Sequence, residues 1–455
     1  MLPLVRVTGG NPKAIGIALG YIKRGRLSLN EVIEHLHVAS KTVNNVFDDL
    51  FARVWDVMTQ DAKHVLLVAP FFVDYASKEA LGATAGLTEY HLDNAVEELV
   101  ELKLLDIKEA SVAFSQSYSV HPLTRAFAGA QLGKRPDFKE QARMRWSKYY
   151  MDFVAHSLGP EKLKDPYWDS LSAYGHKLID PEWLNLREVL IWADQQGQNH
   201  ILVELMLLLT HYMCTRMLFS TRLYYAQKAA EAANKLGRKE DAALLYIDAL
   251  GWILFEQGRL VDAIREITTG LRIAQTLHAS STDATDLIAL ASTFLAMIFL
   301  GQGDLAKASA LMDKIASLEY KPVIQYRVIT LAGDIAYKKN NIAEAIKIYK
   351  SAYQISMPYG GEDVSSRLGN VYLASGDLIR AEAYFNEVLD MELHFGTSAA
   401  PHAKYGLARV AQAKGEKDKA RQIAQEVLND LSRTVTSHRL LNEIHSFLKS
   451  LEDIS

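Results

Sequence analysis

Cysteine is almost absent from this sequence. One cysteine, Cys214, occurs among 455 residues, so no disulfide bond can form within the chain. A single thiol is typical of proteins from a reducing compartment. An excess of one charge sign is also lacking: 50 lysines and arginines stand against 54 aspartates and glutamates, for a net charge of -4. This balance gives no global electrostatic reason to expect a nucleic acid or an anionic membrane as partner.

Long apolar runs are missing too. The longest low-polarity stretch, Leu287 to Leu300, contains Ser292 and Thr293. It falls short of the about 20 residues that a membrane-spanning helix needs, and we interpret it as a buried helix of a repeat. The chain begins MLPLVRVTGG, without the charged-then-apolar pattern of a signal peptide. We therefore expect a cytoplasmic protein with no membrane contact.

Catalytic and metal-binding motifs are likewise absent. The sequence contains neither H-E-x-x-H nor C-x-x-C, the spacings that bring zinc ligands or redox cysteines together. Adjacent acids, such as Glu97 with Glu98, are expected on solvated faces of helices. We expect no catalytic residue, no metal site and no enzymatic activity.

A pattern of small residues recurs through the C-terminal half, from about Tyr224 to about Leu428. Each copy has an alanine twelve residues after a small residue, and a turn residue lies between the two. The pairs are Gly251 and Ala263, Ala296 and Ala308, Gly333 and Ala345, Gly369 and Ala381, and Ala408 and Ala420; the turn residues are Gly258, Gly303, Asn340, Gly376 and Gly415. Small residues let two helices cross closely, and the turn needs a residue that tolerates positive φ.

This pattern resembles the tetratricopeptide repeat, a helical hairpin with a period of about 34 residues. One hairpin cannot bury its own apolar face, so successive hairpins stack into a superhelix. A degenerate hairpin is expected before these copies, with its second helix at RLYYAQKAAEAANKLG, and residues 435–453 are expected to form a capping helix. The resemblance implies an α-solenoid rather than a generic helical bundle.

In this family the first helix of each hairpin usually lines a concave groove. Aromatic and charged side chains on such a groove suit the recognition of a protein or peptide. By register, the groove positions are Asp248, Trp252, Phe255, Arg327, Asp334, Tyr337, Asn370, Tyr405 and Arg409. For each position, packing between repeats is the alternative to ligand contact.

Residues 46–132 do not follow the repeat pattern and predict a different set of elements. DAKHVLLVAPFF and SKEALGATAG predict two short helices, the second with Ser77 as N-cap. LTEYHLDNAVEELVELKLL predicts a third helix, and the alternating segment up to His121 predicts a hairpin. Three helices and a β-hairpin describe a winged helix. Its third helix carries Glu89, Asp93, Glu97, Glu98 and Glu101 against Lys103 alone. Phosphate would be repelled by such a face, so we expect protein packing and not direct DNA binding.

A basic, aromatic helix follows the predicted winged helix. Tyr149 and Tyr150 lie in it beside Arg143, Arg145 and Lys148. Such a composition would also suit RNA, but we expect it to pack against the winged helix.

The N-terminal segments resemble the C-terminal part of an NB-ARC module, which belongs to the STAND class of signal-transducing nucleotide-switch ATPases. The resemblance rests on TGGNPKAIGIALGYI (Thr8 to Ile22), the winged helix, and YSVHPLTRAFA (Tyr118 to Ala128). IDPEWLNLREVLIWADQQGQ, at Ile179 to Gln198, is similar to the segment that joins winged helix and repeats in bacterial regulators of this class. The resemblance to the NB-ARC module implies that Pro12 packs near an adenine and that His121 contacts a β-phosphate. A helix-start proline and an interfacial histidine are the alternatives.

The sequence departs from that class in one respect: it contains no G-x-x-x-x-G-K-[ST]. Without this motif no backbone loop and no lysine cradle the phosphates. We therefore expect a fragment that begins inside the switch module, with no cofactor of its own; ATP or ADP would belong to the full-length relative. Pro12 and His121 are then at most half of a site.

The expected fold is mainly α, a winged helix followed by an α-solenoid. Residues 1–45 would be a remnant of the NB-ARC-like module, 46–132 the winged helix, 133–205 a helical linker and 206–455 the repeats with their cap. The predicted function is a sensor and regulator that binds a protein, peptide or small ligand and controls a nucleotide switch in a missing ATPase core. The alternatives are a transcriptional regulator of the same class and a free-standing scaffold.

Overall fold

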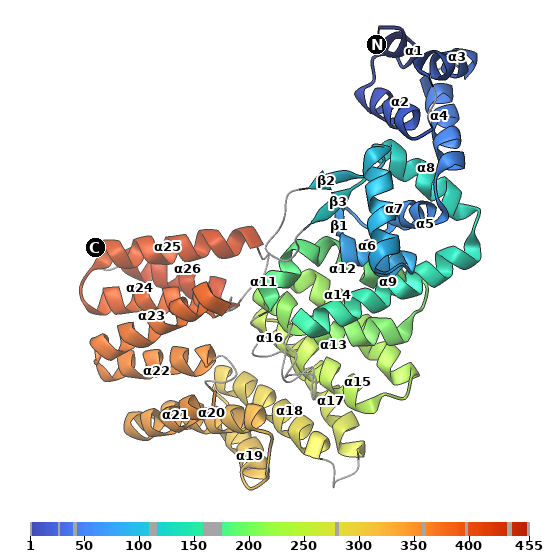
Figure 1. The fold of residues 1–455 in the computed structure, drawn as a ribbon. Coiled ribbons are helices and arrows are strands. Elements are labelled where there is room, and N and C mark those ends of the chain that lie inside the picture. The colour runs from blue at the N-terminus through green and yellow to red at the C-terminus, as the bar shows by residue number, and fades with distance from the viewer. Residues whose placement is uncertain are drawn as a thin grey trace. The chain divides into compact units, whose positions relative to one another are not determined.

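The computed structural model describes residues 2–25, 28–39, 43–108, 116–157, 175–277, 282–356, 361–395, 399–434 and 439–452 (Figure 1). These residues form two compact units. The first comprises Met1–Phe153 with Lys177–Trp192, and the second Val154–His176 with Ala193–Ser455. The boundary falls inside the stretch predicted as a linker.

Four helices open the first unit: α1 (Leu2–Val7), α2 (Pro12–Gly25), α3 (Leu29–Ala39) and α4 (Val43–Val57). Asn11 starts α2, because its Oδ1 accepts from the backbone nitrogens of Lys13 and Ala14 at 2.9 and 3.2 Å. Leu4, Ile17, Leu36 and Leu50 form the buried face of this group.

The predicted winged-helix segment contains helices and a small sheet. Its elements are α5 (Gln60–Val68), the 3-10 helix η1 (Ala69–Phe71), β1 (Tyr75–Ser77), α6 (Lys78–Ala85), α7 (Glu89–Glu101), β2 (Asp106–Lys108) and β3 (Ser117–Ser119). The predicted N-cap is confirmed, since the Ala80 nitrogen donates to Ser77 Oγ at 3.0 Å. Helix α7 buries Leu92, Ala95, Val96 and Leu99, which have the spacing of one helix face.

The strands form one antiparallel sheet in the order β1-β3-β2. The predicted hairpin is confirmed by the pairing of β2 with β3, in which Ile107 lies opposite Tyr118; its connection falls outside the described residues. The sequence prediction does not include β1, which pairs with the other edge of β3. A three-residue strand is too short to show a period of its own.

The remaining elements of this part of the chain are α8 (Pro122–Gly133), α9 (Pro136–Ser157), α11 (His176–Ile179), the 3-10 helix η3 (Asp180–Glu182) and α12 (Trp183–Gln195). Trp146 and Tyr150 of α9 are fully buried. The guanidinium of Arg143 lies 3.8 Å from the ring centroid of Phe71, and Arg145 Nε donates to the Thr84 carbonyl at 3.0 Å. The predicted packing of this basic helix against the preceding domain is therefore confirmed.

A buried hydrogen-bond network ties α12 to β1. Asn185 accepts from the Val73 nitrogen at 2.9 Å and donates to the Tyr75 carbonyl at 3.0 Å. Tyr150 Oη and Asn185 Nδ2 both donate to Glu182 Oε2, at 2.6 and 2.8 Å. Burial raises the pKa of the Glu182 carboxyl above its usual value. These bonds explain why the segment around Asn185 folds as part of the first unit.

The second unit is a series of helical hairpins (Figure 1). Its elements are α13 (Asn199–Thr215), α14 (Phe219–Lys235), α15 (Lys239–Leu244), the π-helix η4 (Leu245–Trp252), α16 (Ile253–Glu256), α17 (Leu260–Thr276), α18 (Thr282–Gly301), α19 (Leu305–Ile315), α20 (Pro322–Lys338), α21 (Ile342–Ser356), α22 (Glu362–Ser375), α23 (Leu378–Phe395), α24 (Ala400–Ala413), α25 (Lys417–Thr434) and α26 (Arg439–Glu452). Each predicted residue pair falls on the two helices of one hairpin, and every predicted turn residue has positive φ. The earlier hairpin, α13 with α14, and the capping helix α26 are also present.

The apolar stretch from Leu287 to Leu300 lies in α18. Among the described residues, Asp283–Gly301 is the one helical segment long and apolar enough to cross a membrane. Most of this segment is buried inside the fold. Burial between neighbouring hairpins accounts for its apolar composition, as the sequence predicted.

Two glycines at hairpin crossings leave no room for a side chain. A Cβ atom built on Gly369 would lie 2.6 Å from the Phe385 ring, and one on Gly406 would lie 2.4 Å from the same ring. Phe385 is fully buried. The Phe385 ring of α23 therefore fills the space beside Gly369 of α22 and Gly406 of α24.

We expect Gly369→Ala to lower the free energy of unfolding by about 1–2 kcal/mol, because overlap with Phe385 outweighs the gain in helix propensity. Chemical denaturation measures this loss. Gly301→Ala is the matched control, since a Cβ there meets no atom within 4 Å; it should be neutral or stabilising. Adding Phe385→Leu should recover part of the loss in the Gly369→Ala background. Simple additivity of the two single losses would contradict the crossing explanation.

Candidate functional site: a cavity inside the repeat array

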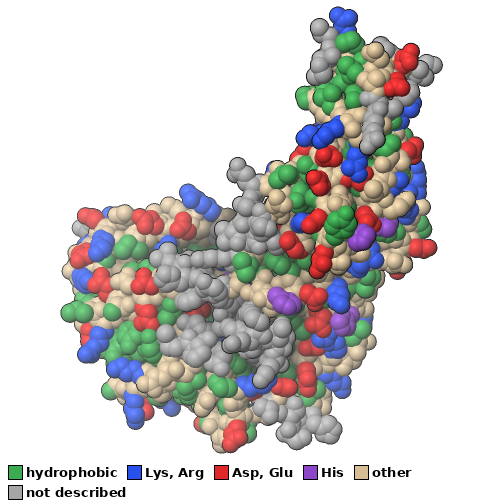
Figure 2. All heavy atoms as spheres, in the orientation of Figure 1, with side chains coloured by type: hydrophobic (Ala, Val, Ile, Leu, Met, Phe, Trp, Pro, Cys, Tyr) green, Lys and Arg blue, Asp and Glu red, His purple; other side chains and the backbone are tan. Residues whose placement is uncertain are grey.

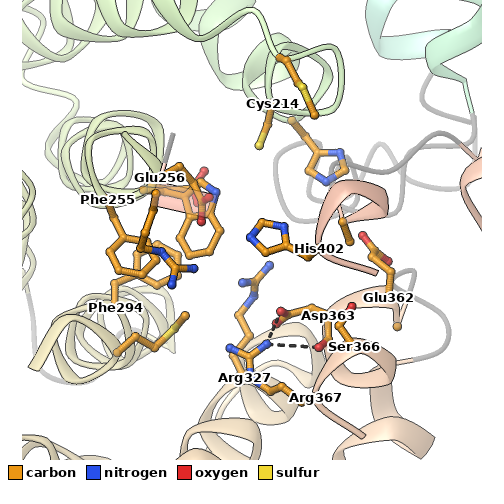
Figure 3. Close-up of a pocket in the computed structure, with 18 of the residues that line it drawn as sticks. Cys214, Phe255, Glu256, Phe294, Arg327, Glu362, Asp363, Ser366, Arg367 and His402 are labelled. Atoms are coloured by element: carbon orange, nitrogen blue, oxygen red, sulfur yellow. Dashed lines mark hydrogen bonds and ion pairs between the residues drawn. The ribbon is translucent and has the colours of Figure 1, made fainter. Parts of the chain in front are cut away.

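A cavity of about 310 Å³ lies inside the second unit. It is lined by side chains from the first hairpin, from the first helix of each later hairpin, and from α26. Figure 3 shows Phe255, Glu256 and Phe294 on one side of it and Glu362, Asp363 and Ser366 on the other, with Arg327 and His402 between them. The cavity therefore has an aromatic wall and a polar wall.

The aromatic wall consists of Trp252, Phe255 and Phe294. The ring centroid of Trp252 lies 5.5 Å from that of Phe255 and 5.2 Å from that of Phe294. Trp252 ends the π-helix η4. π-Helical turns are uncommon and frequently occur at functional sites. This wall offers flat apolar faces to a ligand.

The same π-helix is held by a buried arginine. Arg222 of α14 is 1% exposed. Its Nε donates to the Ala249 carbonyl at 3.1 Å, and its Nη2 donates to the Asp248 carbonyl at 2.8 Å and to Asp248 Oδ2 at 3.4 Å. Where hydrogen bonding changes from i→i+5 to i→i+4, a helix carbonyl loses its regular partner. Arg222 supplies donors at that point.

The polar wall is organised around Arg367 of α22. Its Nε donates to both carboxylate oxygens of Asp334, at 2.9 and 3.2 Å, and its Nη1 donates to Asp363. Tyr349 Oη donates to Asp334 Oδ1 at 2.7 Å. The nearby Arg367 and Arg327 guanidiniums hold the pKa of Asp363 below its usual value despite burial. Two neighbouring hairpins are thus joined by charged hydrogen bonds beside the cavity.

Glu256 is a buried acid on the opposite side of the cavity. It is 6% exposed, and burial raises the pKa of its carboxyl from 4.5 to about 6, although nearby Arg439 opposes the shift. Because the folded pKa is the higher one, folding is penalised as pH rises from 4.5 through about 6. Above that window the penalty is constant, at roughly 2 kcal/mol.

Glu256→Gln should remove this pH-dependent term. The stability difference between variant and wild type should rise by roughly 2 kcal/mol from pH 4.5 to pH 7. Urea denaturation of both proteins at several pH values measures the difference, in which other titrating groups cancel. A constant difference across this range would contradict the raised pKa.

The last helix closes the array on its first hairpins. Phe219 of α14 and Ile253 of α16 belong to the same buried cluster as Leu440, Ile444 and Leu451 of α26. The Arg439 guanidinium also lies 5.0 Å from the ring centroid of Phe255. Elements from the two ends of the repeats thus meet at one side of the cavity.

The structure brings together some of the predicted groove residues. Asp248, Trp252, Phe255, Arg327 and Asn370 line the cavity, and Asp334 lies beside it. Tyr337, Tyr405 and Arg409 do not line it. The Tyr405 ring packs 5.4 Å from the Phe447 ring, and Arg409 Nη1 donates to Asn370 Oδ1 at 2.7 Å. Roles of all nine residues in ligand contact stay predictions.

The sequence prediction does not include several residues that line the cavity: Phe294, Asp363, Arg367, His402 and Arg439. Asp363 and Arg367 share a helix face with Asn370, so helical spacing could have found them. Phe294 lies in the low-polarity stretch from Leu287 to Leu300, where no helical spacing sets it apart. Arg439 comes from the capping helix, whose return to the first hairpins no local pattern indicates.

In the first unit, Glu98 of α7 corrects a sequence prediction. The expectation that Glu97 and Glu98 both face solvent is wrong for Glu98, which is 2% exposed. Its carboxylate accepts from the Thr59 nitrogen at 3.1 Å and Thr59 Oγ1 at 2.7 Å, and lies 3.0 Å from Arg24 Nη2. Arg24 belongs to α2, so the acidic face of α7 is partly covered by a basic helix end.

The two residues implied to contact a nucleotide both begin helices. Pro12 is the first residue of α2 and is exposed. His121 is the N-cap of α8, where its Nδ1 accepts from the Leu123 nitrogen at 3.3 Å. Arg125 fixes the same helix by donating to the Val73 carbonyl at 3.1 Å. Pro12 thus begins a helix, as its alternative describes, while for both residues nucleotide contact stays a prediction.

Comparison with known proteins agrees with the repeat geometry. The family model of the tetratricopeptide repeat matches residues 366–433. The second unit is an α-solenoid of tetratricopeptide-type hairpins. The chain is 30% identical over 427 residues to the transcription activator GutR of Bacillus subtilis (strain 168), in an alignment that covers 93% of this chain and 51% of that protein.

A solved structure is similar in fold. It is a signal transduction ATPase with numerous domains (STAND) protein with a tetratricopeptide repeat sensor, from Pyrococcus horikoshii. The TM-score is 0.52 at 14% identity, covering 97% of this chain and 62% of that one. The chain thus spans about half the length of the curated relative and under two thirds of the solved one.

Proposed function

We propose that this chain is the sensing and regulatory part of a STAND-type signal-transduction protein. In this proposal the repeats bind a ligand and thereby control a nucleotide switch carried by a part of the protein outside this chain. The observation that carries the proposal is the cavity, because side chains from the beginning to the end of the repeat array line it. A ligand there would stabilise the arrangement in which these hairpins meet.

We further propose that α5 to β3 form a winged helix used for protein contact. The order helix, strand, two helices, two strands, and the single antiparallel sheet, support this assignment. On α7, Glu101 lies 2.8 Å from Lys23 Nζ, and Asp93 pairs with Lys78. Acids held in this way bind neighbouring helices and repel phosphate. Figure 2 likewise shows acidic and basic side chains interspersed on the face drawn.

A second candidate is a transcriptional regulator of the same class. The identity of 30% with a transcription activator favours it. We place any DNA-binding part of such a protein outside this chain, because the chain spans only 51% of that relative. Both candidates are non-enzymatic for this chain and cytoplasmic. If the protein has no switch module, we propose instead that this chain is a free-standing scaffold.

The nucleotide part of the proposal predicts that this chain binds ATP or ADP no more tightly than about millimolar, because the phosphate-binding loop is absent from it. Isothermal titration calorimetry with each nucleotide tests this. Tight binding would contradict the proposal. The genomic sequence upstream of the first codon separates the candidates: an in-frame G-x-x-x-x-G-K-[ST] supports a split or truncated switch, and its absence supports the scaffold.

A further inference from the structure

The charges that line the cavity are balanced. Four arginines and four acids line it: Arg222, Arg327, Arg367 and Arg439, with Asp248, Glu256, Glu362 and Asp363. Burial lowers the pKa of His211, another lining residue, to about 4, so its imidazole is neutral at pH 7. Among the residues that line the cavity, arginines and acids are therefore equal in number.

Several of these charges already have partners in the protein. Arg222 bonds Asp248, Arg367 bonds Asp334 and Asp363, and Arg439 lies 3.0 Å from Glu443. A ligand with net charge would bring an unmatched charge against these part-buried, already paired groups, which is unfavourable. A ligand without net charge avoids that penalty and can still exchange hydrogen bonds with guanidinium, carboxylate and hydroxyl groups.

The size of the cavity argues against a polypeptide ligand. At about 310 Å³ the cavity is at the lower end of the range for small-molecule sites. Peptide-binding grooves must be open along the chain they hold. Here α26 packs into the core cluster of Phe219 and Ile253, so the end of the array borders the site.

We propose that the cavity binds a small polar molecule without net charge, either uncharged or zwitterionic, with an apolar face that packs on Trp252 and Phe294. This rests on the proposed sensing function and specifies its ligand. Hydrogen-bonding groups of the ligand face Ser366, His402 and the arginines of the polar wall. Contact with both walls joins η4 and α18 to α22 and α24, which are distant in sequence.

Four groups of probes test the ligand class by thermal shift and calorimetry on the whole chain. They are zwitterions (the amino acids with uncharged side chains), uncharged compounds (pentoses, hexoses and nucleosides), anions (citrate and sugar phosphates) and cations (putrescine and spermidine). We expect a member of the first or the second group to bind. Which of these two groups binds shows whether the ligand is zwitterionic or uncharged. Binding by the charged groups alone, or by no probe, overturns the inference.

Two variants locate the binding. Trp252→Ala removes part of the aromatic wall, and Ser366→Trp fills the cavity without changing charge; each should weaken binding at least tenfold. Ser351→Trp, on the exposed face of α21, is the matched control and should bind as wild type. Unchanged binding in Ser366→Trp overturns the location even if Trp252→Ala fails to fold.

The regulatory proposal is tested separately in the full-length gene product. If a neutral ligand binds but Ser366→Trp leaves nucleotide exchange and transcriptional output responsive to it, the sensing function fails while the cavity assignment stands. If no neutral ligand binds but Ser366→Trp abolishes regulation, the ligand class fails while the sensing function stands.

Discussion

Replacing Arg222 with methionine is expected to lower the free energy of unfolding of the repeat unit by about 3–5 kcal/mol. The guanidinium is 1% exposed and donates to two carbonyls of the π-helix and to the Asp248 carboxylate. Methionine fills a similar volume but donates nothing. The variant therefore leaves a part-buried carboxylate and two helix carbonyls without these donors, and each carries a desolvation penalty.

Denaturation of Arg222→Met beside Arg265→Met measures the effect. Arg265 pairs with Asp262 at 2.8 Å, but its side chain is 62% exposed. Exposed pairs contribute about 0–1 kcal/mol, so this control should change little. Adding Asp248→Asn to Arg222→Met should recover part of the loss, because an amide is less costly than a carboxylate to leave without the Arg222 donor. Equal losses at Arg222 and Arg265 would show that the buried contacts do not hold the π-helix.

Replacing Glu98 with alanine is expected to cost about 3 kcal/mol in the first unit. The carboxylate accepts two hydrogen bonds from Thr59 and lies beside Arg24. Most of the loss comes from the Thr59 bonds at the start of α5, because the Arg24 side chain is 36% exposed and solvent screens its charge. The connection between α2 and α7 should loosen as well.

Glu97→Ala is the control for this position. Glu97 is the neighbouring residue on α7 and is exposed, so its removal should change stability by no more than about 0.5 kcal/mol. Hydrogen exchange then locates the effect: in Glu98→Ala, protection should fall at the start of α5 and the end of α2. A uniform fall across the unit, or equal effects of the two substitutions, would exclude the proposed anchoring role.

Much of the repeat fold could be predicted from the sequence because its determinants are local. Gly376 and Gly415 are needed where φ is positive, and Gly369 is needed where a helix crosses the Phe385 ring. These requirements recur at the same position of each repeat, so they can be recognised without knowledge of the rest of the chain. Ser77 shows the same principle at a single helix start, since it bonds a nitrogen three residues ahead.

The candidate site was only partly predictable because it depends on residues that are distant in sequence. Register identified Trp252 and Arg327, which lie on the first helices of their hairpins. It could not show that α26 returns to Phe219 and brings Arg439 to the cavity. The same limit explains Glu98, whose burial depends on Arg24 and Thr59 and not on its own helix.

The sequence by itself determined the repeating hairpins, their turns and the absence of a phosphate-binding loop, because each of these depends on residues a few positions apart. Only the tertiary structure decided which polar side chains became buried and how the two ends of the array meet beside the cavity. Those outcomes depend on the curvature accumulated over successive hairpins. Small rotations at each crossing add up to a closure that no single repeat encodes.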